Sequence, residues 1–83
     1  MPGITLRYHA FLRDNLNRET ERVEVDGMTA TVADALAAFL KKYPVYNRLA
    51  PALMFARQDE FLQRDDVLKD GDILEVLPPY GGG

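Results

Sequence analysis

The sequence predicts an α+β fold in which one main helix covers one face of a mixed sheet. Three observations support this prediction. Two early segments alternate apolar and polar residues, a central segment repeats apolar residues at helical spacing, and a last alternating segment follows an Asp-Gly-Asp turn. With 83 residues, of which 47% are hydrophobic and 28% charged, the chain is expected to form one domain over residues 1–83, with a flexible Gly-Gly tail within 78–83.

Two strands are expected before the helix. Residues 4–8 alternate apolar and polar side chains, which is the period of a strand with one buried face. Residues 11–17 lose this alternation and are expected to form a short helical turn. The alternation resumes over 20–26, where Val23 and Val25 are expected to point inward.

The main helix is expected to begin at Val32 and to stop at Pro44. Thr31 is a suitable N-cap, and Asp34 at the third helical position approximates a capping box. The apolar stripe that should face the sheet consists of Val32, Leu36, Phe39, Leu40 and Tyr43.

A hairpin and a final strand are expected after the helix. The apolar segments 53–56 and 61–62 flank a polar turn at 57–60, although Met54 and Phe55 fit either the core or an exposed patch. The last strand, 73–77, ends at two prolines that have no N–H to donate. One helix crossing such a mixed sheet is the β-grasp architecture, which is ubiquitin-like.

The alternation in the last strand predicts a partner interface. If Leu74 and Val76 face the core, the side chains between them face solvent beside the tail. A strand covered by a loop on its second face would show the same pattern. The candidate interface consists of Ile73, Leu77 and Tyr80.

Composition argues against several classes of function. A net charge of −3 argues against a nucleic-acid partner, and the absence of cysteine excludes disulfides and a thiol nucleophile. The single His9 is expected to be a surface residue, and the scattered carboxylates show no metal-ligand spacing. No apolar run has the length of a membrane span, and no leader pattern opens the sequence, so a cytoplasmic location without membrane contact is expected.

The end of the sequence, Gly81-Gly82-Gly83, has no side chains to pack. Such a segment contributes nothing obvious to stability, but it can thread into a narrow enzyme tunnel and present the carboxylate of Gly83 there. Pro78 and Pro79 are expected to hold the tail stiff and extended. A frayed end or a cloning linker would also be rich in glycine.

The chain resembles the ubiquitin-like sulfur carriers, and within them the small subunits of molybdopterin synthase. Gly81 departs from that pattern, which more often has a small residue with a side chain at this place. The stretches that carry the resemblance are 4–16 with 23–25, 31–44, and 68–79 with Gly82-Gly83.

The resemblance implies a function for the tail. An ionised carboxylate is a poor electrophile, so an adenylating enzyme of the ubiquitin-activating type would use ATP to convert Gly83 to an acyl-adenylate. A sulfur donor protein would then supply a persulfide sulfur that displaces AMP and leaves a thiocarboxylate. The large synthase subunit would take up the tail and pass this sulfur to a cyclic pterin phosphate. The chain would bind no cofactor itself and would be a non-catalytic, sulfur-donating subunit of a transferase complex in molybdenum cofactor biosynthesis.

Other functions use the same tail. The chain could carry sulfur for tRNA thiolation or for thiamine or cysteine synthesis, or it could be a ubiquitin-like protein modifier. A plain ubiquitin-like binding module is a third class, in which the glycines are incidental. Pro78-Pro79 favours the molybdopterin function over the other sulfur carriers.

Overall fold

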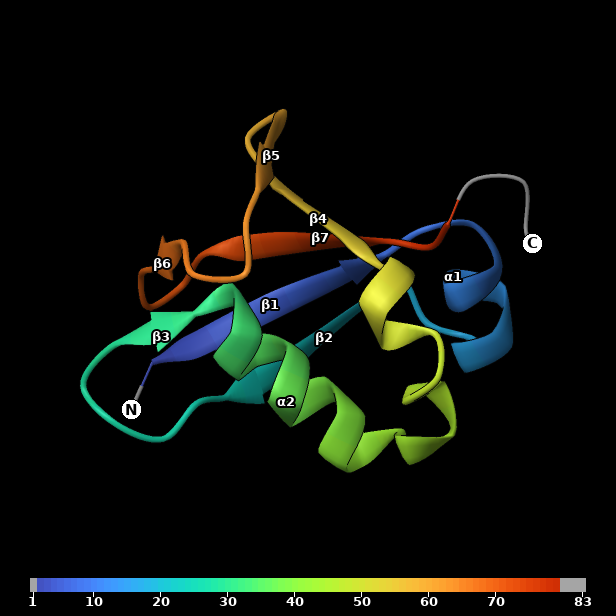
Figure 1. Ribbon diagram of the computed structural model, residues 1–83, viewed down its shortest axis with the longest axis horizontal. Coiled ribbons are helices and arrows are strands. Elements are labelled where there is room, and N and C mark those ends of the chain that lie inside the picture. The colour runs from blue at the N-terminus through green and yellow to red at the C-terminus, as the bar shows by residue number, and fades with distance from the viewer. Residues whose placement is uncertain (1, 80–83) are drawn as a thin grey trace.

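A computed structural model describes residues 2–79 and shows one mixed sheet with a helix across one face (Figure 1). The strands are β1 (Gly3–Tyr8), β2 (Thr20–Glu24), β3 (Ala30–Thr31), β4 (Met54–Arg57), β5 (Glu60–Leu62), β6 (Val67–Leu68) and β7 (Ile73–Leu77). The helices are α1 (Ala10–Leu16) and α2 (Val32–Lys42), with two 3-10 turns, η1 (Pro44–Tyr46) and η2 (Ala50–Ala52). This is the β-grasp arrangement that the element order predicts.

The first and last strands lie together in the middle of the main sheet. The strand order is β2-β1-β7-β4-β5, in which β1 pairs with β2 antiparallel and with β7 parallel. The parallel pairing brings the ends of β1 and β7 to the same end of the molecule, where α1 also lies (Figure 1). Residues 78 and 79 therefore follow a central strand, β7, which is paired on both sides by β1 and β4.

The core lies between α2 and the sheet. Its largest fully buried side chains come from both layers and from the loops that join them: Ile4, Leu6, Tyr8, Leu12, Val32, Phe39, Leu53, Phe55, Leu74 and Val76. The rings of Tyr8 and Tyr43 each pack against Phe39, with centroids 5.7 and 5.4 Å away. Burial of this apolar set is the main source of the fold's stability.

The helix α2 begins as the sequence predicts. The Thr31 hydroxyl accepts a hydrogen bond from the N–H of Asp34 at 3.2 Å, and the Asp34 carboxylate accepts one from the N–H of Thr31 at 3.0 Å, which is a complete capping box. Val32, Ala35 and Phe39 are buried, and the other members of the predicted stripe are partly buried.

Three local features differ from the sequence prediction or go beyond it. The hairpin turn has two residues rather than four, because Gln58 and Asp59 both take positive φ angles, 51° and 68°, that suit a two-residue turn. The predicted short helical turn is a seven-residue helix, α1, closed by Asn17 in the left-handed conformation.

The third feature is a small second sheet formed by β3 and β6, which the sequence pattern does not reveal. Each strand has only two residues, so neither shows a measurable alternation. Hydrogen bonds also join the start of α2 to the segment before β6. The N–H groups of Val32 and Ala33 donate to the carbonyls of Asp66 and Arg64. The start of α2 is thus fixed to the loop before β6.

Within residues 2–79, no helix is long and apolar enough to cross a bilayer.

Candidate functional site

The predicted tail site begins where β7 ends. Pro78 and Pro79 follow Leu77 directly and are partly exposed. Four predicted site residues, Tyr80, Gly81, Gly82 and Gly83, lie outside the described part of the chain, so their roles remain predictions. What the structure does describe is the sheet face that adjoins this exit.

Burial along β7 confirms the predicted alternation. Leu74 and Val76 are fully buried, whereas Ile73 is 43% exposed and Leu77 is partly exposed. The cause is the parallel register, which places Leu74 beside Leu6 and Val76 beside Tyr8 on the core side of the sheet. Ile73 and Leu77 therefore share the face opposite α2, which we call the open face.

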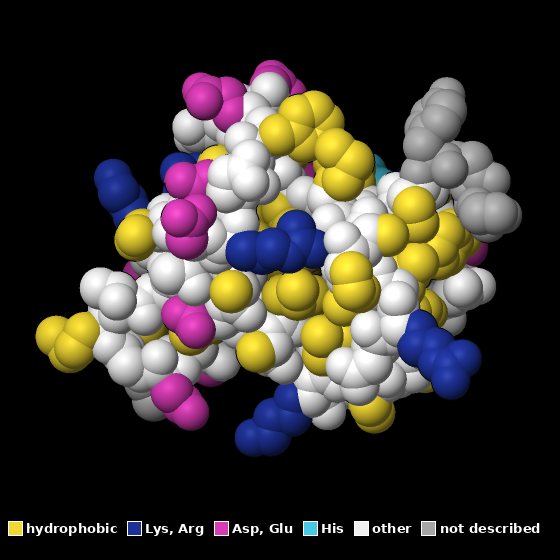
Figure 2. Space-filling view, in the orientation of Figure 1, with side chains coloured by type: hydrophobic (Ala, Val, Ile, Leu, Met, Phe, Trp, Pro, Cys, Tyr) yellow, Lys and Arg dark blue, Asp and Glu magenta, His cyan; other side chains and the backbone are white. Residues whose placement is uncertain are grey.

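Apolar side chains from the hairpin extend this surface. Met54 is paired with Leu77 and is 47% exposed, and Phe61, paired with Ala56, is 66% exposed. We call Met54, Phe61 and Leu77 the apolar patch. Figure 2 views the molecule from the α2 side, and hydrophobic side chains are visible there over β5 at the top.

The structure decides which of Met54 and Phe55 is exposed, and it adds Phe61 to the predicted surface. Phe55 belongs to the core and Met54 to the surface, because neighbouring residues of a strand point to opposite faces. Sequence reasoning missed Phe61, because Phe61 and Leu62 are both apolar and show no alternation that would tell the outward residue from the inward one. The outward position of Phe61 became clear only once the hairpin register was known.

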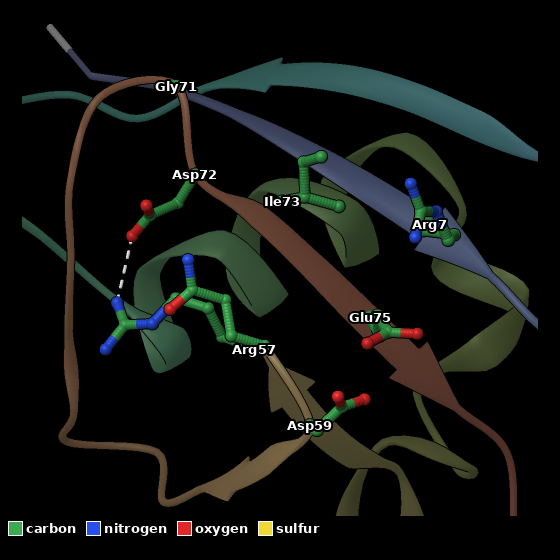
Figure 3. Close-up of a pocket in the computed structure, with 8 residues that line it drawn as sticks. Arg7, Arg57, Asp59, Gly71, Asp72, Ile73 and Glu75 are labelled. Atoms are coloured by element: carbon green, nitrogen blue, oxygen red, sulfur yellow. Dashed lines mark hydrogen bonds and ion pairs between the residues drawn. The ribbon is translucent and has the colours of Figure 1, made fainter.

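A polar hollow of about 350 Å³ adjoins the patch on the open face. Its lining includes Arg7 from β1, Ile73 and Glu75 from β7, and Arg57 and Asp59 from the β4–β5 hairpin (Figure 3). The hollow contains more acid than base, because Asp72 also lines it. It joins three strands that are distant in sequence, which is why no local motif predicted it.

The Asp-Gly-Asp turn forms one wall of the hollow and fixes the start of β7. Asp70 accepts a hydrogen bond from the N–H of Gly3 at 2.7 Å, and the N–H of Gly71, at φ +90°, donates to the carbonyl of Gly3 at 2.7 Å. Asp72 accepts from Arg57 at 2.9 Å and from the N–H of Lys69 at 2.8 Å. The motif is therefore a structural tie between the first and last strands.

His9 lies at the end of β1, close to the tail exit. Its Nε2 is 3.0 Å from a carboxylate oxygen of Glu75, and its side chain is one-third exposed. His9 is therefore partly covered and has a partner, rather than being a free surface residue. The alternation within β1 could not reveal this contact, because His9 and Glu75 are 66 positions apart in the sequence.

A buried carboxylate, Glu21, was not identified from the sequence. Its side chain is 3% exposed and is surrounded by four donors, with the hydroxyls of Tyr8 and Tyr43 each at 2.8 Å. Arg18 donates at 2.9 Å, and the ammonium of Lys42 also pairs with the carboxylate. The strand alternation could have identified it, because Glu21 is two residues before the inward Val23 and therefore lies on the same face of β2.

These contacts set the ionisation of the cluster. Burial alone would raise the pKa of Glu21, but hydrogen bonds from Lys42, Tyr8 and Tyr43 outweigh burial and lower its pKa. Burial and the bond to Glu21 raise the pKa of Tyr8 and, in the same direction, that of Tyr43. Glu21 therefore stays ionised at neutral pH with its lone pairs occupied, which suits a structural clamp between β2, β1 and α2.

The described part of the chain contains no candidate metal centre. Within residues 2–79, no three side chains among His, Cys, Asp and Glu are grouped so as to hold a metal ion, and every buried side-chain polar atom has a hydrogen-bond partner. The features that the described residues do present beside Pro78 and Pro79 are the apolar patch and the polar hollow.

Comparison with known proteins identifies relatives of this chain. The model of the ThiS family matches residues 6–83. The molybdopterin synthase sulfur carrier subunit of Chlamydomonas reinhardtii is 32% identical over 59 residues, which covers 69% of this chain and 71% of that protein.

Solved structures resemble the fold over almost its whole length. Small archaeal modifier protein 1 of Haloferax volcanii matches with a TM-score of 0.80 and 28% identity, over 95% of this chain and 99% of that one. A chain of the Amycolatopsis orientalis BexX/CysO complex matches with a TM-score of 0.66 and 25% identity, over 96% of this chain and 99% of that one.

Proposed function

The chain belongs to the ThiS family, and on that basis we propose that it carries sulfur on Gly83 as the small subunit of molybdopterin synthase. The observation that carries the proposal is the family match over 6–83, which includes the glycine tail, together with the curated relative of that name. The family comprises sulfur carriers and ubiquitin-like modifiers.

The proposed chemistry takes place on the tail and uses partner enzymes. The Gly83 carboxylate attacks the α-phosphate of ATP on an adenylating enzyme, which releases pyrophosphate and leaves an acyl-adenylate. A persulfide sulfur from a donor protein then attacks the acyl carbon and displaces AMP, which leaves an acyl disulfide between Gly83 and the donor cysteine. A second thiol of the donor system attacks the donor sulfur of that bond, forms a disulfide with it and releases the Gly83 thiocarboxylate. Because glycines have no side chains, Gly81 and Gly82 let the terminus enter a narrow active site.

The folded domain contributes a docking surface and an anchor for the tail. The apolar patch of Met54, Phe61 and Leu77 lies on the open face, beside the strand from which the tail leaves. An exposed apolar surface of this kind suits a protein interface. We place Ile73 and Tyr80 in the same interface, and a stiff Pro78-Pro79 would reduce the ordering cost when the tail inserts.

A second candidate function is supported by other relatives. The match to an archaeal modifier protein at 28% identity favours a protein modifier, and the match to a chain of the BexX/CysO complex favours a sulfur carrier of another pathway. All of these functions require an activated C-terminal glycine. They differ in the acceptor of the sulfur or of the acyl group.

The experiment that tests the proposal compares acceptors. The chain is first incubated with an adenylating enzyme, ATP and a sulfur donor, and is then mixed with the large synthase subunit and the cyclic pterin precursor. Formation of molybdopterin supports the proposal. Sulfur transfer to tRNA or to an amino-acid precursor, or isopeptide bonds to protein lysines, in place of molybdopterin would select the second candidate.

A further inference from the structure

Arg22 on the open face and Arg57 at the hollow both already have an acidic partner. Arg22 pairs with Glu24 at 3.2 Å, and Arg57 pairs with Asp72 at 2.9 Å. Within residues 2–79, Arg7 makes no ion pair and no side-chain hydrogen bond, although it is partly buried at the edge of the hollow. A partly desolvated guanidinium with unused donors favours an external acceptor.

The acid paired with Arg7 in the strand register, Glu75, contacts His9 instead. Arg7 and Glu75 are paired residues on the adjacent parallel strands β1 and β7, so their side chains leave the same face of the sheet. The Glu75 carboxylate nevertheless lies 3.0 Å from the ring of His9 and not within ion-pair distance of Arg7. Two of the acids that line the hollow therefore already have partners: Asp72 pairs with Arg57, and Glu75 contacts His9.

The position of Arg7 suits a contact in the middle of an interface. Figure 3 shows Arg7 on β1, across Ile73 and Glu75 of β7 from Asp59 at the hairpin turn. Ile73 provides an apolar floor beside it, and β7 connects the hollow to Leu77 of the apolar patch. Arginine is enriched among the residues that dominate binding energy at protein interfaces, and Arg7 is partly buried in this polar hollow.

We propose that Arg7 determines partner specificity and that the docking partner inserts a carboxylate side chain into the hollow to pair with it. The inference rests on the proposed function, because it assumes that the open face docks a protein. Arginine presents a planar fork of donors that matches a carboxylate. Asp59 lines the far side of the hollow and makes no ion pair within residues 2–79, so it repels an acidic group placed near it and favours a position of the partner's charge beside Arg7.

Calorimetric titration with the large synthase subunit from the same genome tests this inference. Arg7→Ala should weaken binding about tenfold or more, and Arg7→Lys should recover only part of that loss. The matched control is Arg22→Ala, which removes an arginine of the same face that already has a partner, and it should change the Kd by less than about twofold. Unchanged thermal melts of all three variants would show that folding is not responsible.

A charge-swap experiment identifies the partner residue. Arg7→Glu should bind still more weakly than Arg7→Ala, and one acidic residue of the large subunit, when changed to arginine, should restore its binding. Rising salt should weaken wild-type binding more than that of Arg7→Ala.

The outcomes separate this inference from the proposed function. If the wild-type chain binds the large subunit and Arg7→Ala binds equally well, the inference is wrong while the proposed function stands. If the wild-type chain does not bind the large subunit at all, the proposed function fails and this inference fails with it.

Discussion

At the scale of single residues, the least expected feature is Glu21, an ionised carboxylate inside a small domain. Two tyrosine hydroxyls and two cations replace the water that it loses on burial. Since Arg18 and Lys42 remain half exposed, most of the desolvation cost falls on Glu21 itself. The cluster therefore holds the start of β2 to the end of α2 most strongly while Glu21 is charged, because both cations then pair with it.

This arrangement makes stability depend on pH in a defined direction. The folded state lowers the pKa of Glu21 below its ordinary 4.5, so the stabilisation is complete above that pH and is lost as pH falls through the lowered value. Glu21→Gln should lose about 1–3 kcal/mol at pH 7 and show a weaker acid dependence than the wild type. Urea unfolding between pH 7 and pH 2 measures both effects.

The control for Glu21 is Glu24→Gln, because Glu24 lies on the same strand but is exposed. Its loss should stay below about 0.5 kcal/mol. Equal losses at positions 21 and 24 would contradict the clamp.

Ala10 offers a second test at the residue scale. It follows His9 at the start of α1 with φ +53°, a conformation that costs an alanine about 1 kcal/mol relative to glycine. Ala10→Gly should therefore raise the free energy of unfolding, by up to about 1 kcal/mol. The same substitution at Ala37, an exposed position in the interior of α2, should lower it by about 1 kcal/mol. Thermal or chemical unfolding of the two variants checks the opposite signs.

At the scale of elements, β7 connects the core, the docking face and the tail. Its buried residues pair with β1, and its outward residues join the apolar patch and the hollow. One strand thus supports folding with one face and is proposed to support binding with the other. Substitutions at neighbouring positions should separate the two roles.

Leu77→Glu and Val76→Glu test that separation. Leu77 is partly exposed, so its substitution should cost at most about 1 kcal/mol of stability while weakening partner binding. Val76 is fully buried, and an unpaired carboxylate there costs several kcal/mol against a total stability of about 5–15 kcal/mol. Val76→Glu should therefore unfold the domain. Thermal melts showing the reverse order would contradict the assignment of faces.

The elements that the sequence predicts are those with a repeating pattern or a capping motif. The alternation in β1, β2 and β7 and the Thr31–Asp34 capping box were readable because local chemistry decides them. The two-residue turn at Gln58-Asp59 was not, since neither residue is the glycine that usually marks it. The sheet of β3 and β6 depends on a contact between distant segments.

At the scale of the whole molecule, the candidate site depends on the pairing of the first and last strands, β1 and β7, in the middle of the sheet. The fold class follows from the order of elements, but the hollow and the His9–Glu75 contact arise only when β1 and β7 pair. Long-range pairing is also why the open face combines residues from β1, β4 and β7 that no spacing in the sequence connects. The glycine tail is visible in the sequence, but residues 80–83 lie outside the described part of the chain, so its role remains a prediction.

The most direct test of the central claim is tandem mass spectrometry of the chain after incubation with an adenylating enzyme, ATP and a sulfur donor. The chain has no cysteine to take up sulfur, so we predict that sulfur replaces one oxygen at Gly83 and nowhere else. A chain lacking Gly83, or extended by one residue after it, should fold normally by circular dichroism and remain unmodified. An intact fold with undiminished adenylation in either variant, or sulfur at any other position, would contradict the account.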